Sequence, residues 1–67
     1  MSLLAPANPF PVHTRVFWLE GGKTCIGTVM DTETIEGLRF VIIQPDDRSR
    51  RLVKFPFSTV NVATKIR

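Results

Sequence analysis

The sequence predicts an all-β domain: a small barrel of five short strands, with one short helical turn before the last strand. Composition is the first reason, because Val, Ile and Thr number 19 of the 67 residues whereas Ala numbers 3. β-Branched residues suit a pleated, packed surface, and no window of the chain shows a convincing helical period. The second reason is that short apolar runs alternate with turns rich in Gly, Pro and Asp.

A central hairpin is the element on which the rest of the chain is expected to pack. Its first strand includes residues 26–30, its second strand includes residues 38–43, and a polar loop of residues 31–37 joins them. Gly27 lies inside the first of these two hairpin strands, where a glycine often marks a bulge or a sharp bend. Alternation along the second strand places Val41 and Ile43 on the face opposite Phe40 and Ile42. We expect both to lie beneath a partner rather than in water.

The first strand is expected at residues 13–19, and both of its faces are apolar. Val16 and Trp18 share one face, whereas Phe17 and Leu19 share the other. A small barrel normally exposes one of these faces to water. The exposed apolar side chains are therefore candidates for a contact surface, and core packing is the alternative for Trp18.

The remaining elements follow from the turns between them. Gly21 and Gly22 tolerate the positive φ of a tight hairpin, and Cys25 is expected to open the second strand. Pro45 and the aspartates after it predict another turn. The last elements are a fourth strand at 50–55 that Pro56 stops, a helical turn at 57–60, and a fifth strand at 61–63.

The chain is long enough for one domain. Residues 1–12 are expected to be a flexible leader, because their three prolines and lack of charge suit neither strand nor helix. The alternative is an extended arm whose Phe10 and Val12 dock on the barrel or on a neighbour. Residues 13–67 form the barrel, which buries only about 60% of its unfolded surface. Association of copies would add stability, and we expect a homo-oligomer.

Compartment and membrane association are predicted from features that the sequence lacks. Cys25 is the one cysteine, so the chain has no intrachain disulfide. The first residues lack the basic region of a signal peptide, and no apolar run reaches membrane-spanning length. These features predict a soluble, cytoplasmic protein without a membrane partner.

Charge is distributed unevenly along the chain. The net charge is +3, but residues 1–47 carry −3 and residues 48–67 carry +6, which predicts a molecule with one basic face. With Phe17 and Trp18 as apolar contact residues, that face would bind single-stranded nucleic acid by phosphate attraction and base stacking. The alternative is a solvated edge that discourages aggregation. The candidate basic patch consists of Arg48, Arg50, Arg51 and Lys54.

No residue cluster predicts a catalytic site, a metal site or a cofactor site. His13 has no Cys, Asp or Glu at ligand spacing, and Cys25 has no neighbouring base. The turn that ends at Lys23 lacks the spacing of a phosphate loop. The carboxylates that remain are expected in solvated turns, which do not suit general acid–base work. They are Asp31, Glu33, Asp46 and Asp47.

The order of the predicted elements resembles a Src-homology-3-like barrel, and within that fold the chain resembles plasmid-borne type II dihydrofolate reductases over about residues 10–67. Matching features, in order and rough spacing, are Arg15-Val16, Gly21-Gly22, Gly27-Thr28-Val29, Glu36-Gly37, Phe55-Pro56-Phe57 and the end Lys65-Ile66-Arg67. The resemblance implies a tetramer with one central pore that binds folate and NADPH. The family's strand Val-Gln-Ile-Tyr corresponds here to residues 52–55, where Val53 replaces the pore-lining Gln and Phe55 replaces the Tyr. The polar groups that hold both ligands are thus replaced.

The leading functional hypothesis is a non-enzymatic binding module that contacts nucleic acid through its basic loop and strand. A second hypothesis is a protein-interaction or self-assembling barrel that uses the apolar strands at 16–19 and 40–43. The third is a homo-oligomeric barrel of the reductase type.

Overall fold

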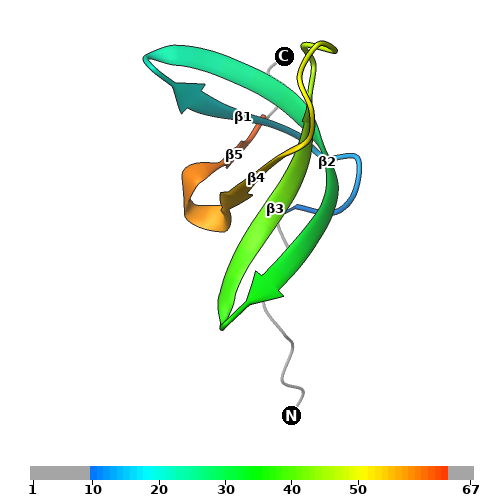
Figure 1. The fold of residues 1–67 in the computed structure, drawn as a ribbon, viewed down its shortest axis with the longest axis vertical. Helices are drawn as coiled ribbons and strands as arrows, with labels where there is room; N and C mark the ends of the chain where they lie inside the picture. Colours follow the sequence, from blue (N-terminus) through cyan, green and yellow to red (C-terminus); the bar gives the residue numbers. More distant parts are fainter. Residues whose placement is uncertain (1–9, 64–67) are drawn as a thin grey trace.

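The computed structural model describes residues 10–63, which form one sheet of five antiparallel strands (Figure 1). The sheet order is β4-β3-β2-β1-β5. A short 3₁₀ turn, η1, lies between the last two strands, so the predicted all-β class and the helical turn before the last strand are confirmed. The elements are β1 (Arg15–Glu20), β2 (Lys23–Ile35), β3 (Leu38–Pro45), β4 (Val53–Pro56), η1 (Phe57–Thr59) and β5 (Asn61–Val62).

The sheet is strongly curved because a short segment joins its two edge strands. In a flat five-stranded sheet the outer strands would lie about 19 Å apart. The five residue steps from Pro56 to Asn61 span at most about 18 Å when fully extended. The 3₁₀ turn shortens that reach further, so the sheet curls and encloses its core on one side (Figure 1).

Two tight turns set the register of the hairpins. Gly21 and Gly22 have φ of 57° and 83°, as the glycine pair predicts, and Glu20 pairs with Lys23 across them. The second strand therefore begins at Lys23, and the prediction that Cys25 opens it is wrong by two residues. A two-residue turn allows pairing to start at the residues that flank it.

The connection between β2 and β3 is also a two-residue turn. Glu36 and Gly37 have φ of 51° and 82°, and Ile35 pairs with Leu38 beside them. The long polar loop predicted at residues 31–37 is therefore wrong, because most of that stretch continues β2. Thr32, Thr34 and Ile35 are β-branched, which favours an extended strand despite its polar composition.

Gly27 marks a close approach of three strands. It pairs with Val16 of β1 and with Pro45 of β3, and a Cβ atom there would lie 2.6 Å from Gln44 O. The predicted bulge lies further along the strand, because the β2–β3 register shifts between Val29 and Asp31.

The core lies on the concave side of the sheet. Val41 and Ile43 are covered by their own domain, and Trp18 is fully buried, as its alternative interpretation expected. Phe10 is 4% exposed, and its ring meets the edge of Phe57 with centroids 4.8 Å apart. Phe10 thus belongs to the core, whereas residues 1–9 of the expected leader lie outside the described residues. The buried apolar residues are Phe10, Val16, Trp18, Val29, Val41, Ile43 and Val60.

The fourth strand begins later and ends later than predicted. Asp47 holds the preceding turn, because its Oδ1 accepts hydrogen bonds from Ser49 N and Oγ while its carbonyl accepts from Arg50 N. Pairing therefore starts at Val53 rather than at Arg50. Pro56 is the last residue of β4 instead of its stop, since β4 is an edge strand and tolerates a missing donor.

Candidate functional site

The convex face of β1 and β2 exposes an apolar group, the β1–β2 apolar group, formed by Phe17, Leu19 and Ile26. Phe17 and Leu19 alternate along β1 with the buried Val16 and Trp18. Ile26 of β2 pairs with Phe17. Leu19 is 65% exposed and Phe17 is half-buried. The predicted division of β1 into two apolar faces is therefore correct, and one of these faces meets solvent.

A second apolar group, the hairpin apolar group, lies where β2 and β3 meet at their turn. Ile35 pairs with Leu38, and Phe40 follows two residues later on the same side of β3. Leu38 is 63% exposed, whereas Phe40 is half-buried. The hairpin apolar group consists of Ile35, Leu38 and Phe40.

A row of polar side chains crosses strands β1, β2 and β3 on the convex face, between the two apolar groups. Arg15 of β1 pairs with Thr28 of β2, which pairs with Gln44 of β3. Arg15 Nη1 donates to Thr28 Oγ1 at 2.8 Å and to Asp46 Oδ1 at 2.7 Å, and its Nη2 donates to Asp46 Oδ2 at 2.6 Å. This bidentate pair ties the first strand to the loop after β3.

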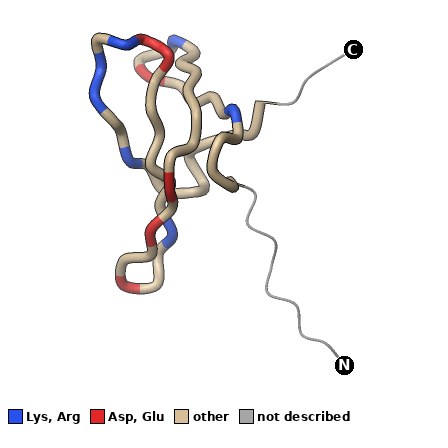
Figure 2. Tube along the Cα trace, turned by 90° about the vertical axis from the view of Figure 1, so that its right-hand side faces the viewer, with Lys and Arg blue, Asp and Glu red and all other residues tan. Residues whose placement is uncertain are grey.

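The predicted basic patch follows one edge of the sheet, along the β3–β4 loop and β4 (Figure 2). Two of its cations already have partners, since Arg50 contacts Glu20 at 3.1 Å and Lys54 contacts Glu33 at 2.9 Å. Glu33 lies within β2 rather than in the predicted turn. Arg48 and Arg51 are exposed and make no ion pair within residues 10–63.

The two predicted apolar contact residues lie on opposite faces of the sheet. Phe17 is on the convex face, but Trp18 is fully buried and packs against Phe55 with ring centroids 5.5 Å apart. Trp18 Nε1 donates to Glu20 Oε2 at 2.8 Å. Trp18 is therefore a core residue and offers no surface on which a nucleic-acid base stacks.

Three carboxylates have lowered pKa values because nearby groups donate hydrogen bonds to them. The indole of Trp18, and then Arg50, lower the pKa of Glu20. Arg15 lowers the pKa of Asp46, and the hydroxyl and amide of Ser49 lower that of Asp47. All three are therefore stable as anions near neutral pH, which suits structural contacts better than proton transfer.

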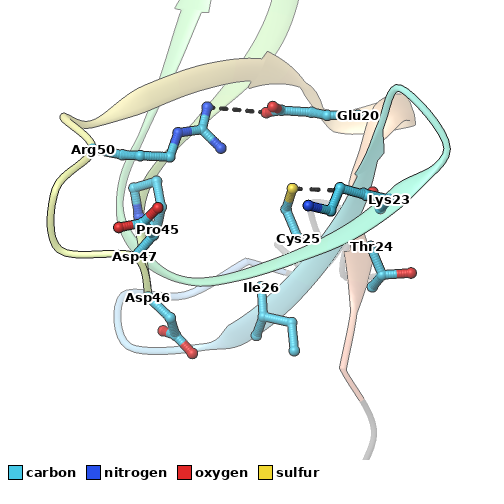
Figure 3. A pocket seen from close by; sticks show the side chains of 9 residues that line it. All are labelled: Glu20, Lys23, Thr24, Cys25, Ile26, Pro45, Asp46, Asp47 and Arg50. Atoms are coloured by element: carbon cyan, nitrogen blue, oxygen red, sulfur yellow. Dashed lines mark hydrogen bonds and ion pairs between the residues drawn. The ribbon is translucent and has the colours of Figure 1, made fainter.

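Two open depressions flank the β3–β4 loop. The first has a volume of about 610 Å³ and lies between the β1–β2 turn and the loop, with the Arg50–Glu20 pair along one side and Asp46 and Ile26 along another (Figure 3). Cys25 also faces it, with Sγ 4.0 Å from Lys23 O. The second, also of about 610 Å³, is lined by Arg15, Thr28, Gln44, Pro45, Asp46, Arg48 and Arg50.

The second depression includes residues that the sequence did not single out. Arg15, Thr28 and Gln44 are far apart in the chain, and only the register of three strands aligns them.

Within residues 10–63 no three His, Cys, Asp or Glu side chains come together as metal ligands do. In the same part of the chain, no helix has the length and apolar character needed to cross a membrane.

A scan against protein-family models and searches of curated proteins and of solved structures gave no match to this chain.

Proposed function

We propose that the chain is a non-catalytic binding module that assembles with copies of itself through the two apolar groups on its convex face. The main support for this proposal is the exposure of Leu19 and Leu38, at 65% and 63%. Each lies beside a half-buried aromatic side chain on the same face of its strand, Phe17 and Phe40 respectively. Large apolar side chains that cluster in the open indicate an interaction surface. A concave core of seven buried side chains would gain from cover on the other face.

A symmetric interface suits this arrangement. Around a twofold axis, the β1–β2 apolar group of one copy would pack on the same group of the next copy. Full burial of an exposed Leu side chain contributes about 1.5–3 kcal/mol, so the two copies of Leu19 would supply a substantial share of a stable contact. The half-buried Phe17 would add less. The hairpin apolar group, at another part of the face, would extend the assembly beyond a dimer.

Charge substitutions in the two groups test this proposal. Leu19→Glu and Leu38→Glu should each lower the solution mass measured by light scattering, because a buried carboxylate without a partner opposes association. Leu52→Glu is the matched control, since Leu52 is 53% exposed and lies outside both groups. Circular dichroism checks that each variant is folded. An unchanged mass in both group variants would contradict the proposal.

A second candidate function is binding of single-stranded nucleic acid along the basic edge. The favouring observation is that Arg48 and Arg51 are exposed and lack ion pairs within residues 10–63. Binding would be weak, because Glu20 and Glu33 already compensate the other two cations, and it would decrease with salt as phosphate contacts do. Titration of a labelled mixed-sequence oligonucleotide at low and high salt tests it, with Arg51→Gln expected to weaken binding and to leave the mass unchanged.

The strand order, with a 3₁₀ turn between β4 and β5, supports our inference of a Src-homology-3-like barrel. The reductase alternative has less support, because Val53 and Phe55 pack against the core of their own domain. Assay of NADPH-dependent dihydrofolate turnover tests that alternative, and absence of turnover removes it. A cytoplasmic location stays a prediction.

A further inference from the structure

The polar row on the convex face forms the floor of a depression whose rim carries loop arginines. Its lining includes Arg15, Arg48, Arg50 and one acid, Asp46. Arg50 is paired with Glu20, which lies outside the lining, so the three arginines and two carboxylates leave a local charge of +1. We propose that this depression binds a phosphate group with unesterified oxygens, as in inorganic phosphate or a phosphate monoester.

The arginines retain donors for such a group. Arg48 makes no ion pair within residues 10–63, so its donors are not engaged by a carboxylate there, although its charge helps to lower the pKa of the nearby Asp46. Arg50 contacts Glu20 through Nη2 and also interacts with Cys25, so its main contribution to the depression is positive charge at the rim. A planar guanidinium matches the oxygens of a phosphate group better than an ammonium group does.

Arg15 is held in position before any ligand arrives. Its two Nη atoms contact both oxygens of Asp46, and Nη1 also contacts Thr28. Both carboxylate oxygens of Asp46 are therefore engaged, which reduces their repulsion of an anion. The side chain of Arg15 loses little further freedom on binding, and such pre-organisation favours affinity.

Two neutral side chains complete the depression. Thr28 Oγ1 accepts a hydrogen bond from Arg15, so its own hydroxyl hydrogen stays available to an anion. Gln44 Nε2 donates to Pro45 O at 3.1 Å and to Arg50 O at 3.3 Å, which holds the loop against β3. Gln44 is thus a positioning residue, whereas Thr28 is a direct donor.

The acids beside the depression are turned to other partners. Asp47 Oδ1 accepts from Ser49 N at 3.0 Å and from Ser49 Oγ at 2.6 Å, and Asp47 is not part of the lining. Glu20 is likewise outside the lining and is held by Trp18 and Arg50. The site is also separate from the outer part of the basic edge, since Arg51 and Lys54 do not line it.

The test titrates the full chain with inorganic phosphate at constant ionic strength, with chloride as the reference salt. The arginine Nε–Hε resonances, followed by NMR, report binding. The wild type should show saturable shifts, and Arg48→Gln should weaken phosphate binding by about tenfold or more through loss of one charged hydrogen-bonding partner. Arg51→Gln removes the same charge from a residue outside the lining, and it should change the affinity for phosphate by less than about twofold. Thr28→Val should weaken it several-fold.

Three results would overturn the inference: shifts that do not saturate, equal weakening by Arg48→Gln and Arg51→Gln, or displacement of phosphate by an oligonucleotide that has no terminal phosphate. The last would assign the depression to internal phosphodiesters that track along the edge. The lining contains no side chain of the two apolar groups, so retained phosphate binding by Leu19→Glu separates this inference from self-assembly.

Discussion

Trp18 Nε1 and Arg50 Nη2 both donate to the same oxygen, Glu20 Oε2, at 2.8 Å and 3.1 Å. The fully buried indole of Trp18 is thus connected through one carboxylate to the loop that rims both depressions. Within the described residues, no buried side-chain N or O atom lacks a partner. Glu20 therefore serves the core and the loop together.

Replacement of Glu20 tests this double role. Glu20→Ala leaves the Trp18 indole N–H without its acceptor, which should cost about 1 kcal/mol of stability. In a domain of this size, that loss lowers the thermal midpoint by about 4–8 °C. Glu20→Gln keeps a side-chain oxygen for the indole and should lose less. Differential scanning fluorimetry of the two variants beside the wild type makes the comparison, and equal midpoints for both variants would contradict it.

Stability should decline in acid because Asp46 and Glu20 have lowered pKa values in the folded chain. A carboxyl group with a lowered folded pKa contributes stability above its unfolded pKa and loses it as the pH falls toward the folded pKa. With ordinary values of 3.8 for Asp46 and 4.5 for Glu20, the loss should start near pH 5 and continue below pH 4.

The share of Asp46 is measured with Asp46→Asn in the same titration. This variant cannot form the ion pair with Arg15, so its thermal midpoint should fall less between about pH 5 and pH 3 than that of the wild type. The difference should be small because the pair is exposed to solvent. A steeper fall in the variant would contradict the assignment.

Gly27 should not tolerate a side chain. A Cβ atom there would lie 2.6 Å from Gln44 O and 2.6 Å from Ile43 Cγ2, and the first of these belongs to the backbone. Gly27→Ala should therefore lower the free energy of unfolding by about 1–3 kcal/mol, measured by urea denaturation. Thr24→Ala, at an exposed position of the same strand, is the control. Equal stabilities of the two variants would show that β3 moves freely.

Phe10 should contribute to folding although it precedes the first strand. Phe10→Ala removes a 4% exposed ring that packs on Phe57, and it should cost about 3–5 kcal/mol. Val12→Ala is the control, because Val12 is 51% exposed. Urea denaturation of both variants measures the difference, and a loss below about 1 kcal/mol for Phe10→Ala would contradict a core role.

Much of the fold was predictable because its local rules agree with the final structure. The alternation of β1 and β3 and the Gly21–Gly22 turn specify faces and a hairpin without help from distant residues. The stretch 31–37 misled because its polar composition suggests a loop, whereas its β-branched residues extend β2. Pro56 misled because the rule against strand proline depends on whether the strand lies at an edge.

The candidate site was less predictable because it depends on pairings between distant residues. The sequence indicates a basic segment, but it does not show that Glu20 and Glu33 compensate Arg50 and Lys54. It shows an aromatic pair, Phe17 and Trp18, but not that Phe17 is half-buried on the convex face whereas Trp18 is fully buried in the core. Arg15 belongs to the arginine-lined depression only through strand register.

The most direct test of the central proposal is the mass of the wild-type chain by light scattering over a range of protein concentrations, at low and at high salt. Self-assembly through apolar groups predicts a dimer or larger species that grows with concentration and withstands high salt, since screening weakens ionic contacts rather than apolar ones. A 7.6 kDa monomer at every concentration and salt would contradict the proposal.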